Sequence, residues 1–214
     1  LDWMPFPSMI VSLSAFFATD RVSGKTYTDK QRREIIKWFW KSNFSRRYNS
    51  GIQDKHRTDI KNLKELSADE NKVIVNFEST IEQSYFLESN FTMGTVNTKT
   101  FVLMLANEEP KSFISGANVR LGDVLKTVNR NEFHHIFPKN FLERNGFDKK
   151  KINCLANFCF LNNADNQKIK DKDPKVYKSL LPSSSIKEIM GHSLCAENSL
   201  DLDYDEFLNK RVEI

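Results

Sequence analysis

The spacing of apolar residues predicts that the first part of the chain is helical. Residues 9–18 are nearly all apolar and predict a buried helix. An amphipathic helix follows, with Thr28 or Asp29 as its N-cap and an end near Gly51. Its apolar positions recur every three or four residues: Ile35, Ile36, Phe39, Trp40 and Phe44. Trp3, Trp38 and Trp40 are expected in the core.

Weaker patterns continue the helical interpretation. Residues 79–91 and 98–110 each predict a helix, the second closed by a proline. Residues 113–128 contain two glycines and fit either a short strand pair or a turn, followed by a helical turn. Residues 182–214 predict a loop and one or two short helices with an acidic surface.

A different pattern occupies residues 131–175. Residues 132–138 (EFHHIFP) predict a strand that ends at proline, and residues 152–163 (INCLANFCFLNN) predict a second one. Between them we expect a lysine-rich loop, with or without a helical turn, and a polar helix from Asn163 or Asp165 to Pro174. The expected order is strand, loop, strand, helix, with His134 and His135 on the first strand, Asn157 on the second and Asn166 on the helix.

Composition narrows the class of protein. With 39% hydrophobic residues in 214, the chain can bury a substantial core. No apolar run approaches the roughly 18–20 residues that a membrane helix needs. No basic segment precedes the apolar stretch near the N-terminus, which disfavours a signal peptide. The first residue is Leu rather than Met, so we expect a fragment of a longer protein. The three cysteines follow no zinc-site spacing and are expected to be free, buried thiols of a reducing compartment.

Positive charge is concentrated in two segments. Residues 1–60 carry a net +5 and residues 134–181 another +5, whereas 61–133 carry −2 and 182–214 carry −4. Such segments suit a polyanionic partner, although scattered solvated lysines are an equally ordinary explanation. A cluster near residue 50 could grip phosphates or could simply stabilise a helix end; it comprises Arg46, Arg47, Lys55 and Arg57.

The histidine pair and the two asparagines supply the groups that phosphodiester hydrolysis requires. A base must deprotonate water, a divalent cation must stabilise charge, and another group must orient the base. Neutral histidine suits the first task, and a side-chain amide on its other ring nitrogen can fix the tautomer. Imidazole, carboxylate and amide groups suit the metal. Two histidines packed in a Phe-rich strand, with asparagines in turns, remain the simpler explanation for each residue taken alone.

Taken together, His134-His135, Asn157 and Asn166 resemble the motif of the HNH (ββα-metal) nucleases. More narrowly, HHIFPKNFL…LANFCFLNNADNQKIKDKDP resembles the HNH-type C-terminal domain of GmrSD-like modification-dependent restriction proteins. This likeness covers residues 131–178, and the preceding RRYNSG stretch is similar to the family less specifically. The DGQQR-type nucleotide-binding motif of the family's companion N-terminal domain is absent from this sequence.

The resemblance implies a role for each residue. His135 matches the general base, Asn157 the residue that holds the loop or the base, and His134 and Asn166 the metal ligands. Asp165, Asn162 or Asn163 would replace Asn166 if the register were shifted. Lys139, Lys168 and Lys170, together with Arg46 and Arg47, are candidates for contacts to nucleic-acid phosphates.

His134 stands where many members of the family have Asp. Exchanging a carboxylate for an imidazole removes a charge and a hard ligand. The affinity of the site for Mg²⁺ should therefore fall relative to its affinity for Mn²⁺, Co²⁺, Ni²⁺ or Zn²⁺. Neighbours on a regular strand also point to opposite faces, so the strand must end or twist at the pair for both rings to serve one site. His56 and His192 stand alone and are expected to be surface or packing residues.

The sequence therefore predicts an α+β protein, mainly helical with an embedded ββα-metal (HNH) finger. The expected parts are a basic helical subdomain (1–130), the nuclease motif (131–178) and a C-terminal extension (179–214). The resemblance implies a metal-dependent DNA endonuclease of restriction or anti-phage defence in a bacterial cytoplasm, using Mg²⁺ or Mn²⁺, with Ni²⁺, Co²⁺ or Zn²⁺ as alternatives. It also implies an N-terminal nucleotide-binding sensor domain as partner. The rival interpretations are a non-catalytic nucleic-acid-binding module and a nuclease acting on RNA.

Overall fold

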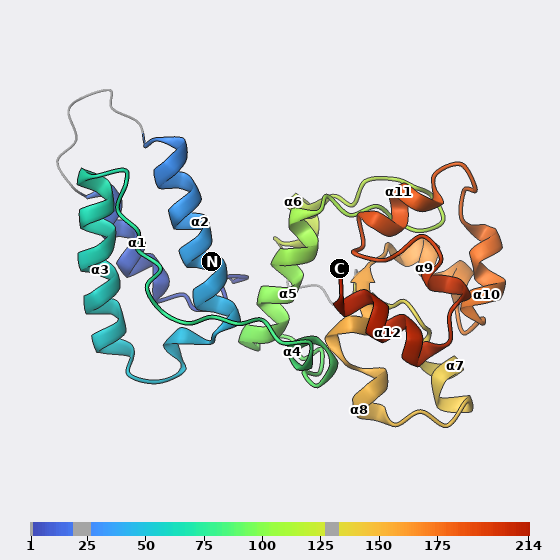
Figure 1. Ribbon diagram of the computed structural model, residues 1–214. Coiled ribbons are helices and arrows are strands. Elements are labelled where there is room, and N and C mark those ends of the chain that lie inside the picture. The colour runs from blue at the N-terminus through green and yellow to red at the C-terminus, as the bar shows by residue number, and fades with distance from the viewer. Residues whose placement is uncertain (1, 19–26, 127–132) are drawn as a thin grey trace. The chain divides into compact units, whose positions relative to one another are not determined.

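The chain forms two compact units, residues 1–81 and 82–214 (Figure 1). The structure is a computed structural model that describes residues 2–18, 27–126 and 133–214. The division falls earlier than the predicted boundary near residue 130, because apolar side chains from the intervening segment join the core of the second unit. These side chains are Phe86, Leu87, Phe113 and Ile114. The stretch predicted to support the nuclease motif is therefore split between the two units.

Helices build the described part of the first unit, residues 2–18 and 27–81. They are α1 (Met9–Phe17), α2 (Asp29–Phe44) and α3 (Ile52–Ala68), with the short 3-10 helix η1 (Arg47–Asn49) between the last two. Helix α1 packs against α3. Thr28 begins α2 with a capping box, in which its side chain accepts from the Gln31 N–H and the Gln31 side chain accepts from the Thr28 N–H. The core of this unit comprises Met9, Phe16, Trp38, Tyr48, Leu63, Leu66 and Ile74.

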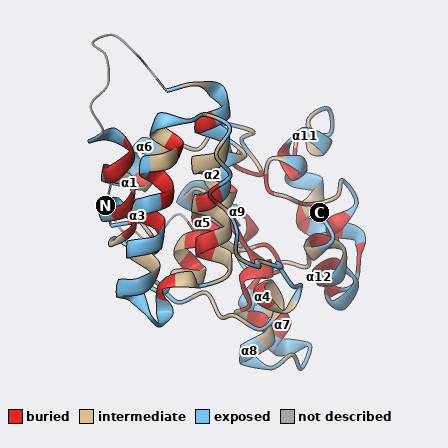
Figure 2. Cartoon of the chain, turned by 60° about the vertical axis from the view of Figure 1, so that its left-hand side comes forward, coloured by how far each residue is buried: buried red, intermediate tan, exposed pale blue. Residues whose placement is uncertain are grey.

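The buried faces of α1 and α2 differ from the predicted ones. Helix α1 is buried on one side only, since Val11 and Phe17 are 55% and 53% exposed. In α2 the buried line runs through Trp38, while Ile36 is 43% exposed and Trp40 is half-buried. Figure 2 shows these helices with buried and exposed residues on opposite sides. Apolar spacing alone misplaced the line because α2 buries polar residues there as well: Gln31, Ser42 and Asn43.

The second unit combines short helices with one small sheet. Its α-helices before the sheet are α4 (Ser84–Leu87), α5 (Val96–Asn107) and α6 (Leu121–Val124). The sheet region holds β1 (Phe133–His135), α7 (Lys139–Arg144), α8 (Lys149–Ile152), the 3-10 helix η3 (Leu155–Asn157), β2 (Phe158–Phe160) and α9 (Asn163–Ile169). After it come α10 (Pro174–Tyr177), η4 (Lys178–Leu180), α11 (Ile186–Gly191), η5 (Ser199–Asp201) and α12 (Tyr204–Val212).

Most predicted elements of this unit are present, with different lengths. Helix α5 ends before Pro110, and a Lys111–Asn118 bridge precedes the helical turn α6, as expected. The helix predicted over residues 79–91 is a single turn, α4. The loop predicted between the two strands contains two short helices, α7 and α8. The two short C-terminal helices, α11 and α12, are confirmed.

The strands β1 and β2 pair antiparallel, with Phe133 opposite Phe160, His134 opposite Cys159 and His135 opposite Phe158. A mainly helical chain with one two-stranded sheet confirms the mixed α+β class. Side chains of directly paired residues share a face of a sheet, and neighbours along a strand alternate. His135 therefore shares one face with Phe158, and His134 shares the other with Cys159. None of the described helices is long and apolar enough to span a bilayer.

Candidate active site

The candidate active site is the β1–β2 hairpin and the helix that follows it. The described residues confirm the expected order of strand, connection, strand and helix, and α9 begins at Asn163 as expected. The strand β1 ends at His135, so the histidine pair does occupy a strand end. Residue 132 of the predicted strand lies outside the described residues. Asn157 was placed wrongly on the second strand, because it ends η3, just before β2.

Asn157 joins the two sides of the connection. It is fully buried, its Oδ1 accepts from the Phe137 N–H at 2.9 Å, and its Nδ2 donates to the carbonyls of Phe137 (3.1 Å) and Ile152 (3.0 Å). The first two bonds fix the chain two residues after His135, and the third fixes the end of α8. The side-chain hydrogen bonds of Asn157 thus hold the loop, and none of them goes to the imidazole of His135. Of the two roles offered by the resemblance, only the loop role matches its hydrogen bonds.

His135 is oriented by Asn153, a residue that sequence reasoning missed. His135 Nε2 lies 3.0 Å from Asn153 Oδ1, and Asn153 Nδ2 donates to the Lys149 carbonyl at 2.7 Å. A carbonyl oxygen only accepts, so the amide of Asn153 must present its own oxygen to the imidazole. In neutral His135 the proton therefore resides on Nε2, which leaves Nδ1 as the basic nitrogen.

The surroundings keep His135 neutral. Burial lowers its pKa below the ordinary value of 6.5, and the nearby charges of His134 and Lys139 lower it further. The hydrogen bond to Asn153 and the charge of Glu143 oppose this shift without reversing it. The ring also lies 4.2 Å from that of Phe158 on the paired strand. An imidazole that is neutral at pH 7 can accept a proton from water.

His134 lies on the opposite face of the hairpin from His135. It shares its face with Cys159, whose side chain belongs to the same buried cluster as Ile169 of α9. Ile169 follows Asn166 by three residues, so the two lie on one side of that helix. The strand register places His134 and His135 on opposite faces of the hairpin, and a metal site shared by His134 and Asn166 stays a prediction.

Two of the residues considered as alternatives to Asn166, Asp165 and Asn162, are engaged elsewhere, whereas Asn163 is exposed. Asp165 is 1% exposed, and its Oδ2 accepts from Ser112 Oγ (2.7 Å), Ser115 N (2.9 Å), Ser115 Oγ (3.0 Å) and Ile114 N (3.1 Å). Burial opposes ionisation of Asp165, yet these hydrogen bonds hold its pKa below the ordinary value. Asn162 accepts from the Asp165 N–H and donates to Ser112. Asn166 is half-buried and its side chain has no hydrogen bond with a described residue.

The described side chains limit the ligands that a metal ion could have at this site. Within residues 2–18, 27–126 and 133–214, no three His, Cys, Asp or Glu side chains group closely enough to hold a metal ion. The candidate pair is one imidazole and one amide oxygen, His134 and Asn166. Such a pair leaves most coordination positions to water or substrate oxygens.

The candidate phosphate-binding residues divide between the units. Lys139, Lys168 and Lys170 are exposed in the second unit, and the first two lie 3.7 Å from Glu143 and 3.8 Å from Asp165. Arg46 and Arg47 belong to the first unit. Arg46 is exposed with φ of 51°.

Arg47 has a structural role that conflicts with the predicted one. Its side chain is 11% exposed and donates two hydrogen bonds to buried Asp59, at 2.8 and 3.1 Å. The guanidinium also lies 4.1 Å from the ring centroid of Phe77. Because both of these contacts are within the core of the first unit, Arg47 is not presented to a phosphate.

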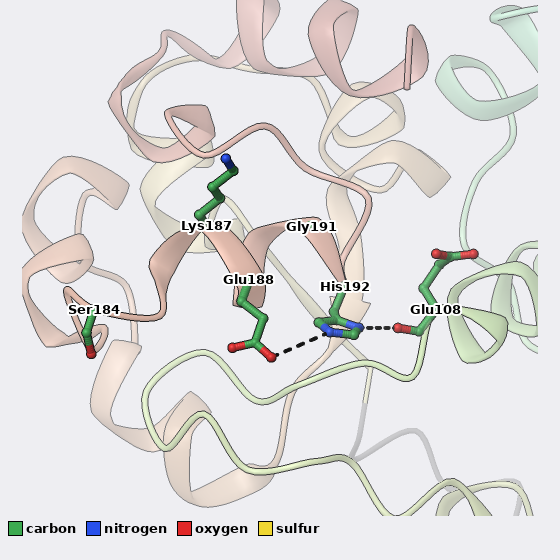
Figure 3. Close-up of a pocket in the computed structure, with 6 residues that line it drawn as sticks. All are labelled: Glu108, Ser184, Lys187, Glu188, Gly191 and His192. Atoms are coloured by element: carbon green, nitrogen blue, oxygen red, sulfur yellow. Dashed lines mark hydrogen bonds and ion pairs between the residues drawn. The ribbon is translucent and has the colours of Figure 1, made fainter.

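The remaining histidines and the cysteines have structural environments. His56 bonds Ser12 at 2.7 Å and stacks on Tyr48. His192 bonds the Glu108 carbonyl and lies 4.0 Å from Glu188, while the Glu108 carboxylate and Lys187 point away from it (Figure 3). Both are packing residues, as expected.

The free thiols are buried, as predicted, and burial raises the pKa of each: Cys154, Cys159 and Cys195.

Comparisons with known proteins identify an uncharacterized archaeal relative. The chain is similar to uncharacterized protein MJ0686 of Methanocaldococcus jannaschii, with 27% identity over 216 aligned positions. The alignment covers 99% of this chain and 33% of that protein, so the chain spans about a third of its length. No protein-family model matches the sequence, and no solved structure matches it significantly.

Proposed function

We propose that the chain is a metal-dependent DNA endonuclease in which His135 activates water. The main support is the hydrogen bond from His135 to Asn153, which leaves Nδ1 as the basic nitrogen of a neutral imidazole. In the proposed reaction Nδ1 takes a proton from water, and the water oxygen attacks phosphorus. The bond from phosphorus to the leaving ester oxygen then breaks, and that oxygen is protonated by solvent.

His134 and Asn166 would hold the divalent cation. Their donor types fit such an ion, and the side chain of Asn166 has no hydrogen bond with a described residue. When bound, the ion would stabilise negative charge on the phosphate and the leaving oxygen. Because the two rings lie on opposite faces of the hairpin, the proposal requires the phosphodiester to lie across the strand end, within reach of His135 from one face and of His134 from the other.

The test is cleavage of supercoiled plasmid with Mg²⁺, Mn²⁺, Co²⁺, Ni²⁺ or Zn²⁺ and with EDTA. Wild type should open the circle with at least one metal and not with EDTA. His135→Ala should lower the rate by about 10²–10⁴-fold, the range for a general base, and keep DNA affinity. His56→Ala is the matched control, since His56 is a partly buried packing residue of the first unit. Equal cleavage by wild type and His135→Ala would refute the role of His135.

The replacement at position 134 gives a second test. If His134 is a ligand, His134→Asp adds a hard carboxylate and should raise activity with Mg²⁺ relative to Mn²⁺ about tenfold. Cleavage rates measured as a function of each metal concentration give this ratio. An unchanged ratio would remove His134 from the metal site.

A non-catalytic binding module is the runner-up, favoured by the lack of a three-residue His, Cys, Asp or Glu group among the described residues. Binding of plasmid without cleavage under any metal would support it, and cleavage of RNA in place of DNA would support an RNase. The resemblance extends our proposal to restriction or anti-phage defence, with specificity contributed by a companion domain. The greater length of the archaeal relative is compatible with such a domain.

A further inference from the structure

A polar pocket lies beside the first turn of α9. It encloses about 310 Å³ between the segment 112–124 and the N-cap of α9. This volume is at the lower end of the range for small-molecule sites, roughly 300–1,000 Å³. The side chains that define it are Ser112, Asn118, Arg120, Asp123, Val124 and Asn162.

Hydrogen bonds join the two walls of this pocket. Ser112 and Ser115 on one wall donate to Asp165 of α9, and Asn162 Nδ2 donates to Ser112 Oγ at 2.8 Å. The turn that contains the two serines closes at Gly116, which adopts φ of 65° and whose N–H donates to the Ser112 carbonyl at 2.9 Å. Since the carboxylate of Asp165 is buried and accepts four bonds, the walls are fixed before any ligand arrives. A preformed pocket avoids the entropic cost of ordering on binding.

Two polar groups in the pocket remain available. Arg120 and Asn118 are exposed, and neither side chain has an ion pair or hydrogen bond with a described residue. Asp123 adds a carboxylate, and buried Val124 adds an apolar surface. A mixture of donors and acceptors beside an apolar surface suits the edge and face of a nucleobase. The carboxylate makes a bare phosphate a poorer ligand for the same pocket.

We propose that this pocket binds the nucleobase of a nucleotide that adjoins the scissile phosphate. Its location rests on the proposed function: Asn162 caps α9, and Asn166 lies four residues further, about 6 Å along the axis. Arg120 and Asn118 would hydrogen-bond the base edge, so cleavage would depend on the base at this position.

Binding can be tested without cleavage by titrating the isotope-labelled full chain with nucleotides. The probes are the four 5′-deoxynucleoside monophosphates, with 2-deoxyribose 5-phosphate as the probe that lacks a base. At least one nucleotide should shift the NMR signals of Asn118 and Arg120, and the probe without a base should not. Equal shifts with the probe without a base, or no shifts, would overturn the proposal.

Variants separate this pocket from the proposed metal site. Arg120→Ala should weaken the preferred nucleotide about tenfold, as loss of a bidentate base contact does. Lys126→Ala is the matched control, because it removes a neighbouring exposed charge that does not line the pocket. Asp165→Asn, with thermal unfolding measured alongside, should weaken nucleotide binding by loosening the walls.

Cleavage of a randomised DNA library distinguishes the two proposals. Arg120→Ala should lose the base preference beside the cut while Lys126→Ala retains it. If wild type cleaves and Arg120→Ala has the same preference, the base pocket is refuted and the nuclease stands. If nucleotides bind at Asn118 and Arg120 but no metal supports cleavage, the pocket stands and the proposed nuclease fails.

Discussion

Each unit of the molecule buries an aspartate, and different kinds of donor stabilise the charge of the two carboxylates. In the first unit Asp59 accepts from the Arg47 guanidinium and the Tyr48 hydroxyl. In the second unit the Oδ2 of Asp165 accepts from two serine hydroxyls and two backbone N–H groups. The first arrangement is a charge pair that ties a loop to α3. The second is a set of directional bonds from neutral donors that fixes a loop against α9.

In the first unit the buried aspartate holds parts of the core together, whereas in the second unit it fixes the position of a loop beside the candidate site. In the first unit, buried Trp38 Nε1, Asn43 Oδ1 and Asn62 Nδ2 have no hydrogen-bond partner among the described residues. In the second unit Ser193 Oγ and Ser199 Oγ likewise have no partner among the described residues, but both polar atoms of the Asn157 amide and the carboxylate of Asp165 are satisfied. Both sets of bonds are directional, since the bidentate Arg47–Asp59 pair also fixes geometry, but only the second set lies next to the candidate site, where reacting groups must be held in place.

Asp59→Ala should have the largest effect on stability, because it leaves the Arg47 charge buried without its partner. Breaking a buried ion pair costs about 3–5 kcal/mol. Denaturant unfolding followed by tryptophan fluorescence should show the first unit unfolding early. Asp54→Ala removes an exposed ion pair of the same unit and should cost well under 1 kcal/mol. Similar losses for the two variants would contradict the role given to Asp59.

Asn157→Ala should destabilise the second unit by about 3 kcal/mol, since it leaves the N–H of Phe137 and two carbonyls unsatisfied in the core. Cleavage should fall further than the unfolded fraction explains, because the chain after His135 loses its anchor. The comparison is Asn145→Ala, which removes an exposed amide with one hydrogen bond to the Phe141 carbonyl. Denaturation and cleavage measured on the same samples separate the two effects.

Asp165→Asn should change the acid sensitivity of the protein. The folded pKa of Asp165 lies below its ordinary 3.8, so its ionised form contributes stability that is fully present above about pH 4 and is lost as the pH falls through the folded pKa. Asparagine removes this contribution, so the stability of the variant should fall less steeply below pH 4. Asp173→Asn, at the N-cap of α10, serves as the control. Identical acid-unfolding curves for wild type and Asp165→Asn would show that neutral donors do not favour the charged form.

Asn153→Asp should have the smallest effect, confined to pH dependence. A carboxylate beside His135 favours the imidazolium and raises the pKa that burial has lowered. Protonated His135 cannot accept a proton from water, so the acidic limb of the rate profile should move to higher pH in the variant. Asn153→Ala should lower the rate without that upward movement. A limb that does not move in Asn153→Asp would place the titrating group elsewhere.

The sequence predicted the order of elements better than their contacts. Apolar runs located β1 and β2, proline and cap residues located α5 and the starts of α2 and α9, and the His134-His135 pair is at the end of a strand. These signals depend on residues that are neighbours in the sequence, so they can be detected without knowledge of the fold. The buried side of α2 could not be predicted, because it depends on which side the neighbouring helices cover.

The hydrogen-bond and ion-pair partners of the candidate residues could not be predicted from the sequence either. Asn153 has no mark that distinguishes it from other loop asparagines, and its importance arises only when α8 brings it to His135. The Asp165 bonds join residues about 50 positions apart, so no spacing rule could reveal them. Arg47 looked like one more basic residue of a cluster, and only the fold pairs it with Asp59.

The buried thiols have a practical consequence for labelling. Maleimides and related reagents react with the thiolate, and all three native cysteines are buried with raised pKa values. A cysteine introduced at an exposed position such as Lys126 should therefore react first in the folded protein, without removal of the native ones. One such cysteine in each unit would allow a pair of fluorophores to report the distance between residues 1–81 and 82–214 as DNA is added.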